Sequence, residues 1–299
     1  MRRFILRHLA VYYMLIASLC FALTGAFAKM LSEQMGSVEV VFWRNLIGLA
    51  LVVYALAKAP HAKLTHGKGR PLLLIFRGVI GVVALLAFFY NIAHISLAAA
   101  FTFSKTSPIF TAIFCFLFLK ERISLRGWGG ILLGFVGILL IVQPNIGIHK
   151  SDLIGIFSGV GGALAYTSVR ELRKCYDVKV IVLSFMFFGS LIPLGLMAFG
   201  ESLQSAFSGT FSFLYAPFVM PDAVSWAQIV AMGVFGAVFQ VNLTKAFAAS
   251  RSAGVIAAVG YTDILFSLLF GVMLGDGLPN LLACAGILVV IIAGILVSV

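Results

Sequence analysis

Two oppositely charged side chains, Lys105 and Asp263, lie inside long apolar stretches of the chain. An ionisable group at membrane depth costs about 3 kcal/mol on insertion scales unless it faces water or a partner, so each residue is a candidate for a binding site. If the two pair, a charged or zwitterionic ligand can separate them, or Asp263 can take up a coupling proton. The alternative is a static ion pair that only fixes the packing of two helices.

Arg44 and Pro108 are the next candidates. Arg44 follows Glu39 by five residues, a spacing that lets the carboxylate neutralise it only in part. Arg44 is either a structural or gating residue, which snorkels toward headgroups, or a contact for the anionic group of a ligand. Pro108 removes a backbone hydrogen bond and is expected to kink its helix near the depth of Lys105. Arg77 is interpreted as a snorkelling residue at the end of its apolar stretch.

Uncharged polar groups can orient a ligand without the cost of a net charge. Four such candidates are Tyr90, Tyr166, Gln240 and Tyr261. Gln240 is preferred over Asn242, because two residues that are two apart on a helix cannot both face one cavity. Tyr166 and Tyr261 can stack on a planar ligand, although packing against a neighbouring helix is the ordinary role of a single ring.

Motifs of catalysis are missing from the sequence. It contains no HExxH, Walker A, Gly-x-Ser-x-Gly or CxxC motif, and its five histidines and four cysteines are scattered. We therefore expect no enzyme, no cofactor and no metal site.

Ten apolar stretches, which would have to position these residues, fill almost the whole chain. A membrane-spanning helix needs roughly 20 predominantly apolar residues. Of the 299 residues 62% are hydrophobic and 10% are charged. The sequence therefore predicts an all-α polytopic membrane protein with spans at 10–30, 37–57, 71–92, 97–118, 127–143, 151–169, 179–199, 224–245, 252–274 and 279–298.

Basic residues indicate the orientation of these spans. If the N-terminus is cytoplasmic, 17 of the 21 lysines and arginines fall in the tail and the connections on that side, as the positive-inside rule requires. Both termini are then cytoplasmic, in an inner or plasma membrane of the bacterial type. The net charge of +11 is spread over short loops, so we expect no nucleic-acid partner.

An internal repeat divides the chain into two five-span halves, 10–143 and 151–298. A shift of 155 residues aligns the segment Thr106 to Phe110 with Tyr261 to Leu265, and Glu121 with Asp276. Because five is odd, the halves enter the membrane from opposite sides. Inverted repeats of this kind are typical of carriers that alternate access to a site near the midplane.

Several segments of the first half resemble the EamA branch of the drug/metabolite transporter superfamily in their order and spacing. They are Ala98 to Phe101, Ser107-Pro108-Ile109-Phe110, Leu119-Lys120-Glu121-Arg122, and the glycines Gly130, Gly134 and Gly137. The second half departs from the pattern, with Asp263 opposite Pro108 and Gly275-Asp276 where the family usually has Gly-Glu. The resemblance implies a ten-helix bundle around a central cavity that carries small organic solutes by alternating access.

We therefore expect a secondary transporter of a small amphoteric metabolite, such as an amino acid, a nucleobase or a cofactor-like compound. Its partners would be this solute, the lipid bilayer and, as a coupling ion, protons. A non-transporting membrane scaffold and a membrane-embedded enzyme remain the alternatives. The direction of transport and the oligomeric state stay open.

Overall fold

The computed structural model describes residues 2–58, 69–120, 124–142, 148–199, 218–249 and 259–298, and within these residues it is helical without a β-strand. The helices are α1 (Arg2–Leu31), α2 (Ser37–Ala57), α3 (Pro71–His94), α4 (Leu97–Ser104), α5 (Ser107–Leu119), α6 (Leu125–Val142), α7 (Lys150–Leu172), α8 (Val178–Ala198), α10 (Ala223–Ala249), α12 (Thr262–Met273) and α13 (Leu281–Ser298).

Length and composition identify the membrane-spanning elements. Among the described residues, eight stretches are long and apolar enough to cross a membrane, and α12 and most of α13 form two shorter apolar helices. The predicted spans agree with the helices to within a few residues at most ends. The chain is therefore a polytopic helical membrane protein, as its hydropathy predicts.

The fourth predicted span is interrupted rather than kinked. Helix α4 ends at Ser104 and α5 begins at Ser107. Pro108 has no backbone N–H with which to satisfy the Ser104 carbonyl. The Ser107 hydroxyl donates to that carbonyl instead, at 2.5 Å. The predicted span is present, but it is divided over Lys105 and Thr106, which is a sharper change than the kink predicted from Pro108.

The ninth predicted span also differs from expectation. Asp263 was expected near the middle of a helix, but α12 begins at Thr262, so Asp263 lies in its first turn. Residues 250–258, the first part of that span, lie outside the described residues. The starts of α5 and α12, at Ser107 and Thr262, are 155 residues apart, and so are the ends of α3 and α10, at His94 and Ala249.

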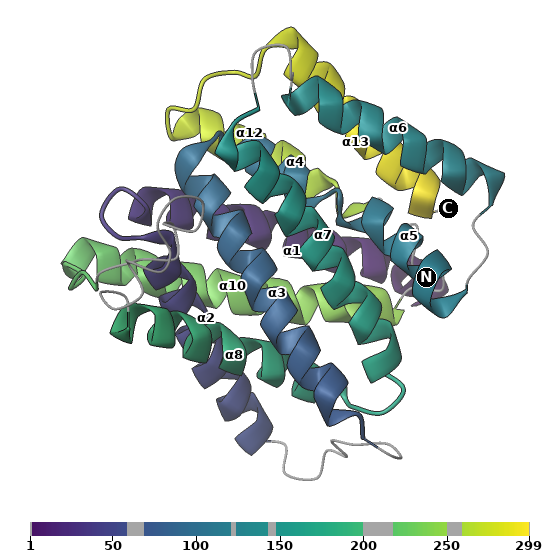
Figure 1. Cartoon of the computed structure of the whole chain (residues 1–299). Helices are drawn as coiled ribbons and strands as arrows, with labels where there is room; N and C mark the ends of the chain where they lie inside the picture. Colours follow the sequence, from purple (N-terminus) through teal and green to yellow (C-terminus); the bar gives the residue numbers. More distant parts are fainter. Residues whose placement is uncertain are drawn as a thin grey trace.

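Pairs of helices build the bundle (Figure 1). Helix α1 packs along α10, α2 along α8, and α3 along α7, while α13 pairs with α6 at one side. Helix α4 contacts α12 and α7, and α5 also lies against α7. The two interrupted helices are therefore held between α1 and α7.

Small residues allow the closest of these approaches. A Cβ atom at Gly155 of α7 would lie 2.6 Å from Phe103, and one at Gly159 would lie 2.9 Å from the Phe103 carbonyl oxygen. These distances are too short for a methyl group, so both positions need glycine. The small-xxx-small spacing thus brings α7 onto the break between α4 and α5.

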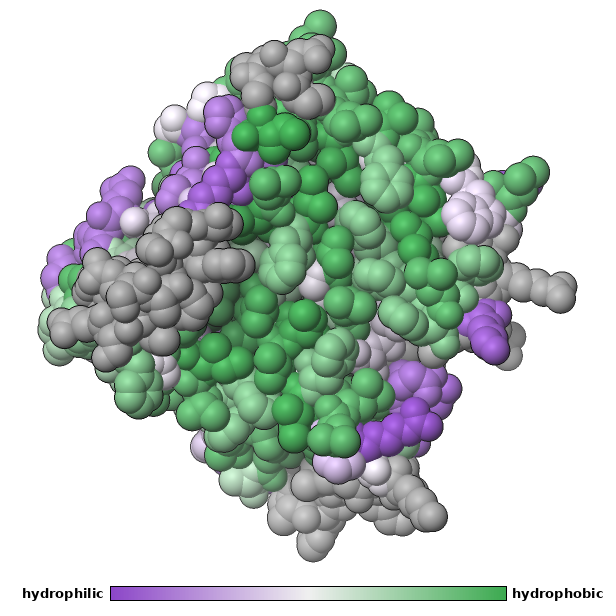
Figure 2. Space-filling view, in the orientation of Figure 1, coloured by the Kyte–Doolittle hydropathy of each residue, from purple (hydrophilic) through white to green (hydrophobic). Residues whose placement is uncertain are grey.

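The outer surface of the bundle is apolar. Leu72, Leu125 and Leu281 are 81%, 89% and 87% exposed. Hydrophobic residues fill the middle of the face in Figure 2, and hydrophilic residues gather toward its upper left and lower right. A broad exposed apolar face of this kind is expected where lipid tails, rather than water, surround a protein.

Candidate functional site

Lys105 and Asp263 meet where the two interrupted helices face each other. Lys105 is the residue that follows α4, and its Nζ lies 2.6 Å from Oδ2 of Asp263. The aspartate side chain is 1% exposed and the lysine side chain 19%. Asp263 Oδ1 accepts no hydrogen bond from the described part of the chain. The pair is thus buried on one side, and the carboxylate keeps an unused acceptor.

Tyr261 attaches the second interrupted helix to the first. Its hydroxyl donates to the Lys105 carbonyl oxygen at 3.3 Å. That carbonyl is free because the next helix starts afresh at Ser107. Tyr261 is only 3% exposed, so its ring packs within the protein and does not offer a face to a ligand in this conformation.

A cluster of four phenylalanine rings from four helices reaches the lysine side of the pair through Phe21. Lys105 Nζ lies 6.0 Å from the centroid of the Phe21 ring. Phe21 in turn stacks on Phe239 at 4.4 Å and contacts Phe101 edge-on at 4.8 Å and Phe88 at 5.5 Å. The Phe21 ring adds a cation–π attraction to the lysine.

Three of the other predicted site residues occupy different surroundings. Gln240 is half-buried on α10, next to Phe239, and Tyr166 of α7 is 50% exposed. Tyr90, by contrast, packs in a separate cluster with Ala87 and Ile154, and its ring stacks on His94 at 3.9 Å. The structure therefore places Tyr90 away from the aromatic residues around Lys105.

Arg44 and Glu39 do not form the partial contact that their spacing suggested. Glu39 accepts hydrogen bonds from Trp43 Nε1 at 3.2 Å and from the Val219 backbone at 3.1 Å. Arg44 is 2% exposed and donates to the Asn45 side chain at 3.1 Å. An arginine this deeply buried does not snorkel, so that interpretation was wrong.

Arg77 is a partly buried cation and not the snorkelling residue that the sequence predicts. It lies in the second turn of α3, and its guanidinium stacks over the Phe185 ring at 4.8 Å. The guanidinium also lies beside Gly81, one turn further into the helix. The side chain therefore runs toward the middle of α3 rather than toward its end, opposite to what snorkelling requires.

A second ion pair, which the sequence interpretation missed, joins three helix ends. Lys29 at the end of α1 pairs with Asp276 after α12, and its Nζ also donates to the Ile95 carbonyl at 3.0 Å. Asp276 Oδ2 accepts from the backbone N–H of Leu97, the first residue of α4, at 2.7 Å. We call this group the Lys29–Asp276 latch. Opposite charges at the ends of two spans were its only signal in the sequence.

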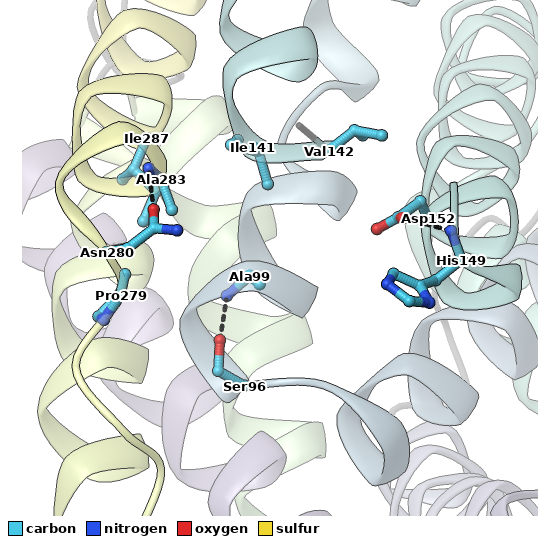
Figure 3. Close-up of a pocket in the computed structure, with 10 residues that line it drawn as sticks. All are labelled: Ser96, Ala99, Ile141, Val142, His149, Asp152, Pro279, Asn280, Ala283 and Ile287. Atoms are coloured by element: carbon cyan, nitrogen blue, oxygen red, sulfur yellow. Dashed lines mark hydrogen bonds between the residues drawn. The ribbon is translucent and has the colours of Figure 1, made fainter. Parts of the chain in front are cut away.

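A pocket of about 270 Å³ opens beside the latch, not at the Lys105–Asp263 pair (Figure 3). It lies between α4, the start of α7 and the start of α13, with Ser96 and Ala99 on one wall, His149 and Asp152 on another, and Asn280 on a third. Asp152 accepts from the His149 backbone at 2.9 Å. The lining of this pocket contains no residue of the predicted site.

Interrupted helices that meet at a buried charge pair are a feature of membrane transporters, where half-helix ends and freed carbonyls face the solute. The fold and this arrangement are those expected of a polytopic helical transporter.

Comparison with known proteins identifies the family. The EamA-like transporter family model matches residues 8–143. An uncharacterized transporter of Helicobacter pylori strain J99 is 34% identical over 96% of this chain and 94% of its own length. The chain therefore belongs to the EamA-like transporter family, as its sequence resemblance predicts.

Relatives with named solutes are transporters too. The pseudopaline exporter CntI of Pseudomonas aeruginosa strain UCBPP-PA14 is 32% identical over 95% of this chain and 93% of its own length. An S-adenosylmethionine uptake transporter of Rickettsia bellii is 25% identical over 55% of each chain. A crystal structure with 17% identity matches 98% of both chains at a TM-score of 0.60, which supports the fold alone. These findings make the protein a transporter of a small metabolite.

Proposed function

We propose that the protein is a secondary transporter of an amphoteric metabolite, and that the Lys105–Asp263 pair forms the centre of its solute site. The pair is buried, it lies where two interrupted helices meet, and one carboxylate oxygen has no hydrogen-bond partner within the described residues. A solute with an amino and an acidic group can replace each partner of the pair in turn. This buried pair is the observation that carries the proposal.

Energetics favour a pair that opens. Desolvation of two charges costs about as much as their attraction returns, so a buried ion pair is a weak source of stability. An exchange of partners with a zwitterion therefore changes the free energy little, and a proton on Asp263 would release Lys105 in the same way. We propose protons as the coupling ion on this basis.

Relatives support an amphoteric solute of moderate size. S-adenosylmethionine, named for the Rickettsia bellii relative, carries an amino group and a carboxylate as well as a ring system. One named relative is an exporter and another an uptake transporter, so both directions occur among them. We propose further that residues 10–143 and 151–298 are the two inverted repeats and that both termini are cytoplasmic in a bacterial-type inner membrane. No chemistry on the solute is required.

A comparison of single and double variants tests the site. We expect Lys105→Met and Asp263→Asn each to lower the free energy of unfolding, by up to about 3–5 kcal/mol, because each leaves one charge buried alone. The double variant should regain much of this loss. The measurement is the melting temperature of the purified protein with and without amino acids, nucleobases and S-adenosylmethionine, followed by counterflow in proteoliposomes.

Loss of the ligand response in the well-folded double variant would support the proposal. A ligand at 100 times its Kd stabilises the native state by about 2.7 kcal/mol. The loss of this stabilisation in a variant is therefore easily measured. Glu171→Gln is the matched control, since it breaks an exposed ion pair with Arg70 at the ends of α7 and α3. A double variant that still performs counterflow at the wild-type rate would make the pair a packing element only.

A further inference from the structure

Arg44 is a buried cation with no anion beside it among the described residues. Its side chain is 2% exposed, and within the described residues its Nε has no hydrogen-bond partner and Nη1 donates only to the neutral amide of Asn45. Both oxygens of Glu39, the nearest acid along the helix, are engaged by Trp43 and Val219. No acidic side chain among the described residues lies within 4 Å of the Arg44 guanidinium.

Arg77 repeats this pattern on the neighbouring helix. Its Nε and Nη1 are buried and donate no hydrogen bond in the described part of the chain, and the guanidinium rests on Phe185 of α8. The residue as a whole is partly exposed. Arg77 thus has two buried nitrogens without an acceptor among the described residues, while other atoms of its side chain are accessible.

Helix α8 contacts Arg77 directly and Arg44 through its hydrogen-bond partner Asn45, while the Arg44 guanidinium itself lies against Gly236 of α10. Arg77 lies against Phe185, while Asn45, the partner of Arg44, lies against Gly189. Positions 185 and 189 are one turn apart on one face of α8, about 6 Å along its axis.

Two guanidinium groups in such a place require a counter-ion. Arginine does not give up its proton in proteins, and a charge buried without a partner costs several kcal/mol. The fork of N–H donors matches the oxygens of a carboxylate or phosphate. Within the described residues these three nitrogens have no acceptor, so they can donate to an oxyanion.

We propose that Arg44 and Arg77 form an oxyanion subsite that binds the carboxylate or phosphate group of the transported solute. This proposal rests on the proposed function, because it assigns the anion to the solute. The proposal adds one feature to the solute: an acidic group other than the groups that contact Lys105 and Asp263. The solute class is thereby narrowed to organic anions and zwitterions with an excess carboxylate or phosphate.

Anion-dependent stability tests the subsite without any need for transport. The melting temperature of the purified full chain in neutral detergent is measured in inorganic phosphate, glutamate and succinate, each against chloride at equal ionic strength. Variants are Arg44→Gln, Arg77→Gln and the double, with the exposed Arg126→Gln as matched control. Phosphate also stabilises proteins by exclusion from their surface, but that contribution is the same in every variant.

We expect at least one of these anions to raise the melting temperature of the wild type and of Arg126→Gln more than that of the other variants. The concentration for half of the shift should rise roughly 10- to 100-fold in each single variant, the effect of losing a hydrogen bond to a charged group. Arg44→Lys and Arg77→Lys, which keep the charge but lose the fork, should retain part of the response even if a glutamine variant folds poorly.

Equal shifts in all variants, with every anion, would overturn the subsite. A shift that requires phosphatidylglycerol rather than soluble anions, and that phosphatidylcholine does not produce, would assign the arginines to a lipid headgroup and overturn the solute assignment. Anion binding that depends on the arginines in a protein without counterflow would keep the subsite and reject the transport role. The two proposals therefore fail separately.

Discussion

Tyr261 and Gly294 show how single residues fix the position of the central ion pair. The Tyr261 hydroxyl holds the Lys105 carbonyl, while its ring lies where a side chain at position 294 of α13 would be. Only glycine leaves room for the phenol at that point. The orientation of Asp263, two residues after Tyr261, thus depends on a helix that carries no charged residue near it.

Gly294→Ala is expected to displace Tyr261 and so to lower the free energy of unfolding by about 1–3 kcal/mol, the usual cost of overpacking. The response of the melting temperature to ligand should fall as well, because the Lys105 carbonyl loses its donor. Denaturant or thermal unfolding in detergent measures the first effect. Gly195→Ala on α8, where a Cβ meets nothing within 4 Å, is the control and should change little. Equal effects of the two substitutions would contradict this account.

Helix breaks are the elements that make a site in this bundle. A continuous fourth span would use the Lys105 carbonyl within its own helix, whereas Pro108 leaves the Ser104 carbonyl without a backbone donor in any case. In the interrupted span Ser107 donates to the Ser104 carbonyl and Tyr261 to the Lys105 carbonyl. In lipid such groups must find partners inside the protein, and here the partners belong to the candidate site.

The Lys29–Asp276 latch connects helix ends. It holds together the end of α1, the start of α4 and the connection after α12. We expect Asp276→Asn to loosen this end of the bundle and to speed the reaction of Cys20, a buried thiol of α1, with a membrane-impermeant maleimide. The other cysteines are replaced by serine for this measurement, and labelling is followed over time.

Glu33→Gln serves as the control for the latch, because Glu33 is an exposed acid near the same end of α1. A rate several-fold above that of the wild type is expected for Asp276→Asn alone. Unchanged labelling of Cys20 would show that the latch does not limit access to the interior.

At the scale of the whole molecule, the distribution of charge predicts the orientation in the membrane. We expect a reporter fused after Val299 to be active only if it functions in the cytoplasm, since the basic residues gather on the side of both termini. Fusions to alkaline phosphatase and to a fluorescent protein at this position give opposite readouts. Alkaline phosphatase activity at the C-terminus would contradict this orientation, and together with a cytoplasmic N-terminus it would require an odd number of spans.

Hydropathy alone predicted the membrane class and most helix ends, because a lipid environment permits few backbone solutions for an apolar chain. Family membership was also predictable, since motifs such as Ser107-Pro108 resemble those of the family in their order and spacing. The breaks before Ser107 and Thr262 were less predictable: one proline suggests a kink, whereas the break also depends on hydroxyl donors and on a tyrosine from the other half of the chain.

Tertiary structure decided which charges meet. The sequence singled out Lys105 and Asp263 because charge is costly in lipid, and it suggested their approach through the repeat. It could not show that Lys29 reaches Asp276, that Glu39 turns away from Arg44, or that Arg77 points into the bundle. Those outcomes depend on contacts between helices far apart in the chain. Hydropathy determines where a helix lies in the membrane, but only packing determines which of its faces meets a partner.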